Sequence, residues 1–174
     1  MTMDGIFDHT AGLPDEQVHD HYTTLLSQGD AILYGRTTYE LMEFWRTIVV
    51  SPSDDKSMND FAMAIDKIPK IVFTHTLKKV EWRSATIATR DLKEIASELK
   101  QQPGKDILVG SRSLIIQLLE LKLIDELQIC VYPVVAGKGR GLFENFSDRT
   151  IFKLVNTKIF QSGAVILYYQ PKNN

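Results

Sequence analysis

The feature that most constrains the fold of this chain is an alternation of short apolar runs with segments of helical periodicity. Residues 31–34, 70–74 and 106–109 are short runs rich in apolar or β-branched side chains, as buried strands are. Between them lie segments whose apolar residues recur at a spacing of three and four. Strands that alternate with helices favour a largely parallel sheet covered on both faces, so we expect an α/β fold.

Five segments carry the helical pattern. The first has Pro14 and acidic residues in its opening turn and ends at Gly29, which suits the preferences of helix termini. A later one follows Asp91, and Glu94 stands at the spacing of a capping box. The expected helices cover residues 13–28, 37–46, 54–66, 91–99 and 114–121.

The last third of the chain is β-rich. Residues 127–135 form one long expected strand, and residues 151–160 and 164–170 form two more, joined by Gln161-Ser162-Gly163 as in an antiparallel hairpin. We therefore expect a mostly parallel central sheet flanked by helices, with a C-terminal antiparallel hairpin at its edge. Because the chain has no internal repeat and no long linker, residues 1–174 are expected to form a single domain.

Composition limits the classes of partner that this chain is expected to bind. With 20 basic and 22 acidic side chains the net charge is −2, which favours no nucleic-acid partner, because such proteins usually carry a basic excess. The longest apolar runs fall far short of the roughly 18 residues of a spanning helix, so no membrane partner is expected. The N-terminus lacks the pattern of a signal peptide, and the lone Cys130 cannot form an intrachain disulfide. We expect a cytoplasmic protein.

Two strand-to-helix junctions carry the residues best suited to chemistry. Tyr34-Gly35-Arg36-Thr37-Thr38 and Val109-Gly110-Ser111-Arg112-Ser113 each place glycine at the end of an expected strand, followed by hydroxyl side chains and an arginine. Glycine lets a phosphate approach the backbone, helix N-termini attract anions, and arginine offers a fork of donors. Ligands of open α/β sheets bind outside the carboxyl ends of the strands. Two such junctions together would be able to hold a dinucleotide.

Plainer interpretations stand beside these. Glycine followed by serine or threonine is also how many helices begin, and neither junction matches a G-x-G-x-x-G or P-loop spacing. The loop of residues 137–141, with Lys138 and Arg140, suits either phosphate contact or a solvated connection between strands. The four histidines lack the spacing of metal ligands, so no metal is expected. Tyr39 and Trp45 suit the core as well as a ligand platform.

Taken together, these residues resemble the dihydrofolate-reductase-like proteins, among them the C-terminal reductase domain of the bacterial bifunctional riboflavin deaminase-reductase. Gly35-Arg36-Thr37-Thr38-Tyr39-Glu40 with Trp45 is similar to the family's G-R-x-T-Y-E…W signature, and Thr2-Met3-Asp4-Gly5 is similar to its opening S-x-D-G. Residues 69–82, 99–111 and 123–143 match further segments in order. Each motif alone is weak, but the series covers most of the chain.

The resemblance implies a dihydrofolate-reductase-like fold, a homodimer, and NADPH as the donor of a hydride to a C=N or C=O carbon. The substrate would be a small heterocyclic or ribosylamino compound, as for 5-amino-6-(5-phosphoribosylamino)uracil reductase and dihydrofolate reductase. By motif, the cofactor's phosphates fall to Gly35, Arg36, Thr37 and Thr38, its adenosine half to Thr74, and its pyrophosphate to Gly110, Ser111, Arg112 and Ser113. Asp4 and Trp45 would border the substrate, and Asp4 would orient it or relay a proton; an Asp-Gly turn is the other interpretation of Asp4.

Two departures from the family pattern affect these expectations. The family has a strand before S-x-D-G, so we expect that the recorded start is late rather than that the sheet lacks a central strand. The riboflavin-pathway reductases carry an acid before the second glycine junction, where this chain has Val109, which puts a pyrimidine substrate in doubt. Three hypotheses remain: an NADPH-dependent reductase, a non-catalytic nucleotide- or ligand-binding homodimer of the same fold, and a structural dimer.

Overall fold

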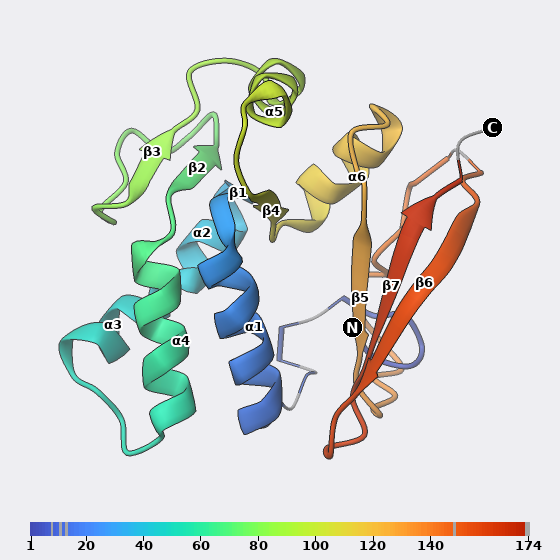
Figure 1. Ribbon diagram of the computed structural model, residues 1–174, viewed down its shortest axis with the longest axis horizontal. Coiled ribbons are helices and arrows are strands. Elements are labelled where there is room, and N and C mark those ends of the chain that lie inside the picture. Colours follow the sequence, from blue (N-terminus) through green and yellow to red (C-terminus); the bar gives the residue numbers. More distant parts are fainter. Residues whose placement is uncertain (8, 11, 13, 148, 173–174) are drawn as a thin grey trace. The chain divides into compact units, whose positions relative to one another are not determined.

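The described residues (1–7, 9–10, 12, 14–147 and 149–172) fall into two units in the computed structural model (Figure 1). The larger unit, His19–Leu123, contains the parallel sheet and most of the helices. The smaller unit combines Met1–Val18 with Ile124–Asn174 and contains the antiparallel strands. The expected α/β class is confirmed.

A four-stranded parallel sheet in the order β3-β2-β1-β4 forms the larger unit. β1 pairs with β2, where Gly35 lies opposite Phe73, and also with β4, where Leu33 lies opposite Val109. Because all four strands run the same way, their carboxyl ends lie at one edge of the sheet. The strands are β1 (Gly29–Gly35), β2 (Lys70–Phe73), β3 (Ala85–Ile87) and β4 (Asp106–Val109). The three-residue β3 was not expected from the sequence.

Most helices begin where the sequence predicts. The carboxylate of Asp55 accepts hydrogen bonds from the backbone amides of Ser57 and Met58, and that of Asp91 accepts one from the amide of Glu94. The helices are α1 (Glu16–Gln28), α2 (Arg36–Met42), α3 (Phe44–Val50), α4 (Lys56–Lys67), α5 (Leu92–Gln101) and α6 (Arg112–Glu120). Residue 13, the expected start of the first helix, lies outside the described residues.

The segment 37–46, expected as one helix, is two helices that meet at Glu43. Six residues apart on one straight helix, Tyr39 and Trp45 would point about 120° apart. The break between the two helices lets the rings of Tyr39 and Trp45 pack against different aromatic residues. Tyr39 is 2% exposed and its ring centre lies 6.5 Å from that of Trp82, whereas the ring centre of Trp45 lies 4.5 Å from that of Phe61. The single-helix prediction was therefore wrong, because two packing directions decide the local path.

A buried ammonium group lies at the amino end of β2. Lys70 is 1% exposed, and its Nζ donates hydrogen bonds to the carbonyl of Ile68 at 2.9 Å and to Ser84 Oγ at 2.8 Å. The same Nζ lies 4.1 Å from the ring centre of Trp82, whose Nε1 donates to Asp66 Oδ1. Burial lowers the pKa of Lys70 to about 8, and the Asp66 carboxylate opposes that effect.

The smaller unit contains an antiparallel sheet in the order β5-β7-β6, made of β5 (Leu127–Val131), β6 (Phe152–Ile159) and β7 (Val165–Pro171). The predicted hairpin is present, and Gly163 in its turn has a φ of +81°, which glycine adopts readily. Two expectations were wrong. β5 ends at Val131 instead of residue 135, because its partner β7 begins at Val165, opposite Val131, and Tyr132 pairs with Thr2 instead. The hairpin also pairs with β5 in a sheet of its own instead of extending the parallel one.

None of the helices within the described residues combines the length and the apolar character that a membrane crossing requires. The expectation of one domain over residues 1–174 stays a prediction.

The buried Lys70 predicts an unusual pH dependence of stability. Its pKa falls from 10.5 to about 8 on folding, so the unfolded chain binds more protons between these values and the free energy of unfolding rises with pH there. A shift of this size corresponds to about 3 kcal/mol. We expect Lys70→Met to flatten the rise, as measured by urea unfolding between about pH 7 and pH 10.

The buried Tyr34 has the opposite effect on the pH dependence of stability, but only at higher pH. Burial raises the pKa of Tyr34 above its usual value of 10.0, so its contribution is present at lower pH and is lost only above that value. Equal slopes for the wild type and Lys70→Met across the tested range would show that Lys70 is not the source of the rise.

Candidate functional site

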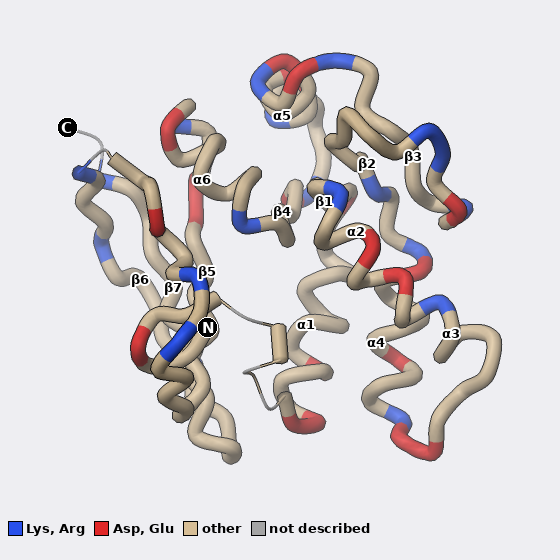
Figure 2. The backbone as a smooth tube through the Cα atoms, turned by 180° about the vertical axis from the view of Figure 1, so that it is seen from behind, with Lys and Arg blue, Asp and Glu red and all other residues tan. Residues whose placement is uncertain are grey.

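The carboxyl edge of the parallel sheet brings the two glycine junctions together. The backbone amide of Gly35 donates a hydrogen bond to Ser111 Oγ at 2.8 Å, and the amide of Gly110 donates to the carbonyl of Leu33 at 3.3 Å. Figure 2 shows basic segments at the starts of both α2 and α6 beside this edge. Two helix N-termini therefore meet at one edge of the sheet, and helix N-termini attract phosphate.

Ser111 links the two junctions at the expense of capping its own helix. It is 2% exposed and stands at the N-cap position of α6, yet its side chain makes no cap hydrogen bond because the hydroxyl accepts from Gly35. The first turn of α6 is thus without the side-chain oxygen that a serine usually supplies there. The Ser111 hydroxyl joins the two junctions, and the exposed Ser113 is the serine of this pair that faces solvent.

The two glycines leave room for different neighbours. A Cβ on Gly35 would lie 3.5 Å from Ser113 Oγ and 3.7 Å from Ser111 Oγ, so the absent side chain leaves open the space in front of the two hydroxyls. At Gly110 the reason is internal, because a Cβ there would lie 2.6 Å from Cε1 of the buried Tyr34. Gly35 therefore keeps a cradle open, whereas Gly110 makes room for a core ring.

Arg36 is the cation at the start of α2. Its Nη1 lies 3.2 Å from Oε1 of Glu40, and both side chains are about half exposed. An exposed pair at this helical spacing stabilises a helix by only a few tenths of a kcal/mol. A phosphate accepts the same forked hydrogen bonds from a guanidinium as a carboxylate does, so an anion bound at this edge would compete with Glu40 for Arg36. Thr37 is exposed beside it, and Thr38 is half-buried.

Thr74 follows β2 at the same edge, beside the end of β1. Its Oγ1 accepts hydrogen bonds from the amides of Thr76 at 3.2 Å and Leu77 at 3.1 Å, which folds residues 74–77 into a turn. Trp45 instead lies in an aromatic cluster of α1, α3 and α4. Its ring centre is 5.5 Å from that of Phe44 and 5.9 Å from that of His19. These contacts favour a packing role for Trp45.

Asp4 belongs to the smaller unit, where it anchors a loop. Its carboxylate accepts hydrogen bonds from Thr2 Oγ1 at 2.5 Å and from the amides of Ala136 at 3.2 Å and Gly137 at 2.7 Å. These bonds, that of Thr2 first, lower the pKa of Asp4 to about 2. Asp4 is therefore ionised at neutral pH and is a poor source of a proton. The geometry favours the turn interpretation of Asp4. It also adds a contact with the backbone of Ala136 and Gly137, which the sequence did not indicate.

The glycine-rich loop after Ala136 is fixed by further contacts of the smaller unit. Gly137 and Gly139 have φ values of +71° and +138°, and a Cβ on Gly139 would lie 2.4 Å from Cγ2 of Ile6. Arg140 pairs with Glu144 at 3.4 Å, and both side chains are exposed. Glycine is thus needed for the backbone path at residues 137 and 139, which supports the interpretation of residues 137–141 as a connection.

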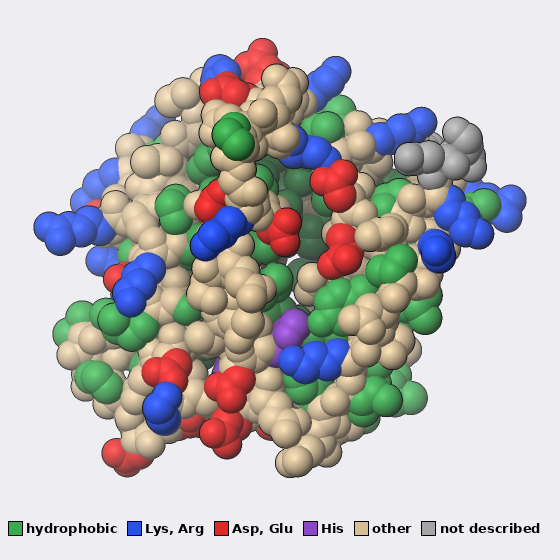
Figure 3. Space-filling model, viewed as in Figure 1, with side chains coloured by type: hydrophobic (Ala, Val, Ile, Leu, Met, Phe, Trp, Pro, Cys, Tyr) green, Lys and Arg blue, Asp and Glu red, His purple; other side chains and the backbone are tan. Residues whose placement is uncertain are grey.

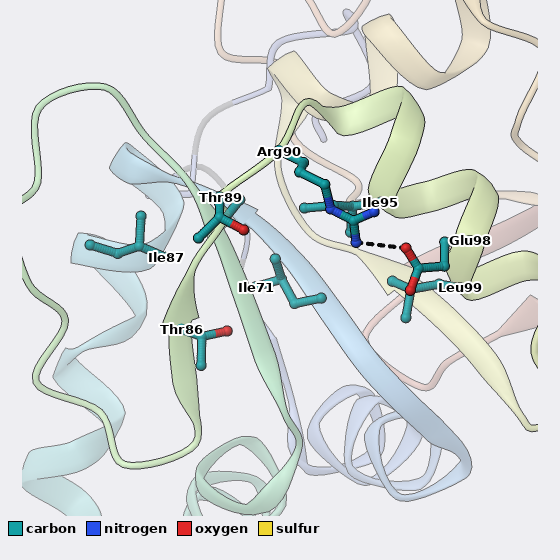
Figure 4. Close-up of a pocket in the computed structure, with 9 residues that line it drawn as sticks. Ile71, Thr86, Ile87, Thr89, Arg90, Ile95, Glu98 and Leu99 are labelled. Atoms are coloured by element: carbon teal, nitrogen blue, oxygen red, sulfur yellow. Dashed lines mark hydrogen bonds and ion pairs between the residues drawn. The ribbon is translucent and has the colours of Figure 1, made fainter.

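A cavity of about 190 Å³ lies between β2, β3 and α5 (Figure 4). Ile71, Ile87 and Ile95 contribute apolar walls, and the side chains of Arg90 and Glu98 form an ion pair of 2.6 Å along it. The cavity is smaller than the 300–1,000 Å³ typical of ligand sites. The sheet edge at Gly35 and Ser111 is therefore the better candidate. Within the part of the chain that the structure describes, no cluster of His, Cys, Asp or Glu is placed to hold a metal ion.

The family described as the RibD C-terminal domain matches residues 1–168. An uncharacterized protein of Bacillus subtilis (strain 168), YyaP, is 34% identical over 173 residues, which cover 97% of this chain and 90% of the relative.

Three solved structures are similar in fold. RibD of Acinetobacter baumannii has a TM-score of 0.69 at 14% identity, over 99% of this chain and 56% of that one. The diaminohydroxyphosphoribosylaminopyrimidine deaminase/5-amino-6-(5-phosphoribosylamino)uracil reductase of Thermotoga maritima has a TM-score of 0.62 at 17% identity, over 98% and 54%. Dihydrofolate reductase of Enterococcus faecalis, solved with NADP(H), has a TM-score of 0.61 at 14% identity, over 99% and 92%. The expected dihydrofolate-reductase-like fold is confirmed.

The link between the junctions makes a testable difference between two serines. Ser111→Ala removes the acceptor of the Gly35 amide, so we expect the free energy of unfolding to fall by about 1–2 kcal/mol. Ser113→Ala, at an exposed position two residues away, should change it by less than about 0.5 kcal/mol. Urea denaturation of the two variants beside the wild type measures both values. Equal losses for the two serines would contradict the linking role.

The anchoring role of Asp4 predicts the behaviour of two amide protons. Asp4→Ala removes both acceptor oxygens, so the amides of Ala136 and Gly137 should exchange with solvent faster than in the wild type. In the wild type their protection should persist at neutral pH and be lost as the pH falls from about 4 towards 2, because the lowered pKa keeps the carboxylate ionised until then. Hydrogen exchange followed by NMR tests this, and unchanged rates at both amides would rule the anchor out.

Proposed function

The chain belongs to the family of RibD C-terminal domains, and on that premise we propose that it is an NADPH-dependent reductase. Its substrate class would be a small heterocyclic or ribosylamino compound that accepts a hydride at a C=N or C=O carbon. The observation that carries the proposal is the hydrogen bond from the Gly35 amide to Ser111 Oγ, which joins two anion-attracting junctions at one sheet edge.

The residues at this edge fit the diphosphate portion of a dinucleotide. The space beside Gly35, which a single Cβ would enter at 3.5 Å from Ser113 Oγ, admits a phosphate oxygen close to the backbone. The N-terminus of α6, the Ser113 hydroxyl and the Arg36 guanidinium supply donors and positive charge. Gly110, Arg112, Thr37 and Thr38 complete the proposed phosphate cradle, and Thr74 shapes the turn beside the adenosine half.

NADPH, when bound, supplies the hydride, and the chain's own residues supply position. Arg36 and the two helix starts would fix the cofactor's charged middle, so that its reactive end is held in one place. Asp4, with a pKa of about 2, would act by holding residues 136 and 137 instead of by giving a proton. Asp4 and Trp45 belong to different units, and their expected place at the border of the substrate stays a prediction.

A second candidate function is a non-catalytic, nucleotide- or ligand-binding relative of the same fold. Val109, the last residue of β4, stands where the resemblance leads one to expect an acid, and it lies next to the proposed cradle. A valine has no group that could recognise a polar heterocycle at that point. This candidate keeps cofactor binding and loses turnover.

Titration with NADPH, followed by nicotinamide fluorescence, tests the proposal. We expect a saturable change at sub-millimolar cofactor, and Arg36→Ala should weaken binding by about 1–3 kcal/mol because it removes a charge-assisted hydrogen bond. Arg46→Ala is the matched control. Arg46 also forms a partly exposed ion pair with a nearby glutamate, Glu43, at 3.4 Å. It lies in α3, away from the sheet edge.

The outcomes separate the candidates. The absence of any saturable binding of NADPH, NADH or flavins would overturn the proposal. Binding without oxidation of NADPH across folate, pterin and pyrimidine substrates, including 5-amino-6-(5-phosphoribosylamino)uracil, would support the non-catalytic relative. Oxidation with any of these substrates would support the reductase. An equal effect of Arg36→Ala and Arg46→Ala would remove Arg36 from the cradle.

A further inference from the structure

The imidazole of His19, on α1, is held through one of its two nitrogens. Its Nδ1 lies 3.5 Å from Oγ of Ser57 in the first turn of α4, and Ser57 is 3% exposed. The Ser57 hydroxyl donates its hydrogen to Oδ1 of Asp55 at 2.8 Å, so only its lone pairs are left for His19. This network assigns the proton of the neutral imidazole to Nδ1, which leaves Nε2 as the nitrogen that gains and loses a proton.

A histidine oriented by a second group, which is itself oriented by a third, is the arrangement expected of a general acid or base. Asp55 is the third group here. Hydrogen bonds from the Ser57 hydroxyl and from the amides of Met58 and Ser57 hold its pKa below the usual value, and His19 contributes by electrostatic attraction. At 3.5 Å the contact between His19 and Ser57 is long, and such contacts often shorten only when a substrate binds.

Two aromatic rings fix the position of the imidazole. The ring centre of His19 lies 5.9 Å from that of Trp45, with the ring planes 81° apart, and 5.9 Å from that of Phe61. These contacts restrict the imidazole without using Nε2, and within the described residues no group hydrogen-bonds to that nitrogen. His19 is half-buried, so Nε2 is left to an external partner.

The face of α1 that carries His19 also carries a hydroxyl without a partner. Thr23 lies four residues after His19, so the two side chains project from the same side of the helix. Within the described residues the buried Oγ1 of Thr23 has no hydrogen-bond partner, whereas Oγ1 of Thr24 donates to the carbonyl of Asp20 at 2.9 Å. A bound ligand would explain a buried polar atom that the chain itself leaves unpaired.

The same face of α1 leads to the sheet edge. Leu26, one turn after Thr23, belongs to the core cluster that also contains Tyr34. Tyr34 directly precedes Gly35, and its ring is the group that a Cβ on Gly110 would meet at 2.6 Å. The layer that α1 covers therefore ends at the two glycine junctions.

The distance from the junctions suits a reaction at the far end of a bound cofactor. Trp45, which contacts His19, lies nine residues after Arg36, and Glu43 at the break between α2 and α3 keeps helical backbone angles. At 1.5 Å per residue, the two helices separate Arg36 from Trp45 by about 14 Å at most. A phosphate at Arg36 would thus leave room for one nucleoside and a substrate before His19.

Asp55 is the charged group that acts on His19 from the start of α4. Figure 3 shows acidic and basic side chains mixed over the face that it views, so no large field of one sign dominates there. The other charged side chains around the imidazole pair with each other or are exposed: Arg46 with Glu43, Lys56 with Asp60, and the exposed Glu16, Asp20 and Asp54.

We propose that His19 is the proton donor of this reductase and acts from Nε2 on the nitrogen or oxygen of the bond that is reduced. The inference rests on the proposed function and deepens it, since that function leaves the source of the proton open. The carboxylate of Asp4 stays ionised and does not fill this role. Thr23 would hold the same substrate through its hydroxyl.

The step balances with one hydride and one proton. The carbon of the C=N or C=O group receives the hydride with its electron pair, and NADPH becomes NADP⁺. The π electrons of that bond move to the nitrogen or oxygen, which takes the proton from Nε2 of the imidazolium. The neutral imidazole keeps its proton on Nδ1, beside Ser57, and regains the other from water.

The first test needs no substrate. Two-dimensional ¹⁵N NMR of the histidine side chains in the full chain reports which nitrogen carries the proton, and His19→Gln identifies the signals of His19. We expect the Nδ1-protonated form, and Ser57→Ala, with an unchanged circular dichroism spectrum, should shift the population towards Nε2. A wild-type His19 protonated on Nε2 when neutral would overturn the inference.

The second test is the oxidation of NADPH with the folate, pterin and pyrimidine substrates between about pH 5 and pH 9. His19→Gln should lower kcat at least about 100-fold, because a general acid contributes about 10²–10⁴-fold, and should leave the dissociation constant of NADPH within about threefold. Wild-type kcat should fall as the pH rises through the neutral range, and His19→Gln should lose this dependence. Thr23→Val should raise KM about threefold to tenfold.

His75→Gln is the matched control, since it makes the same substitution at an exposed histidine. It should leave kcat within about twofold. A His19→Gln variant with wild-type kcat and pH profile, or an equal loss in His75→Gln, would overturn the inference and leave the reductase proposal intact. Binding of NADPH without its oxidation by any of these substrates would also overturn the inference, because no proton is then transferred. Failure to bind NADPH would overturn the proposed function, and the inference with it.

Discussion

The hydrogen bond from the Gly35 amide to Ser111 Oγ is the interaction on which the candidate site depends. It joins residues 76 positions apart and turns two separate helix starts into one surface. The bond has a consequence for α6, because Ser111 gives its hydroxyl to Gly35 and makes no cap hydrogen bond on its own helix. Because the Ser111 side chain does not cap α6, the backbone amides of the first turn of α6 keep the capacity to donate hydrogen bonds to an external acceptor. That capacity is the condition for anion binding.

The basic side chains at the two ends of the parallel sheet differ in their exposure and in their partners. At the amino end of β2, the Lys70 ammonium has Ile68, Ser84 and the Trp82 ring as internal partners, so its charge is satisfied within the unit. At the carboxyl end, Arg36 has only an exposed partner on its own helix. Partly exposed donors at one end and closed bonding at the other explain why ligand binding is proposed at the carboxyl edge.

Local sequence patterns predicted the elements that local forces determine. The caps at Asp55 and Asp91 and the turn at Gly163 act within a few residues, so their chemistry is visible in the sequence. The break at Glu43 follows from two distant ring partners and carries no glycine or proline to mark it. Similarly, nothing near Ser111 indicates that its hydroxyl bonds to residue 35, since strand adjacency decides that contact. The early end of β5 likewise depends on where its partner β7 begins, which no residue near Val131 marks.

The motif around Asp4 is recognisable in the sequence, but its role is not. Its spacing fits both a proton relay and an Asp-Gly turn, and the sequence does not distinguish them. The structure adds three donors, from Thr2, Ala136 and Gly137, all of which prefer the ionised carboxylate. A group that stabilises its anion this strongly is well suited to orient what lies beside it, and for the same reason it holds no proton at neutral pH. In a reduction that needs a proton as well as a hydride, the proton would then come from water or from a group with a higher pKa, and the part left to Asp4 is to fix the backbone of the loop.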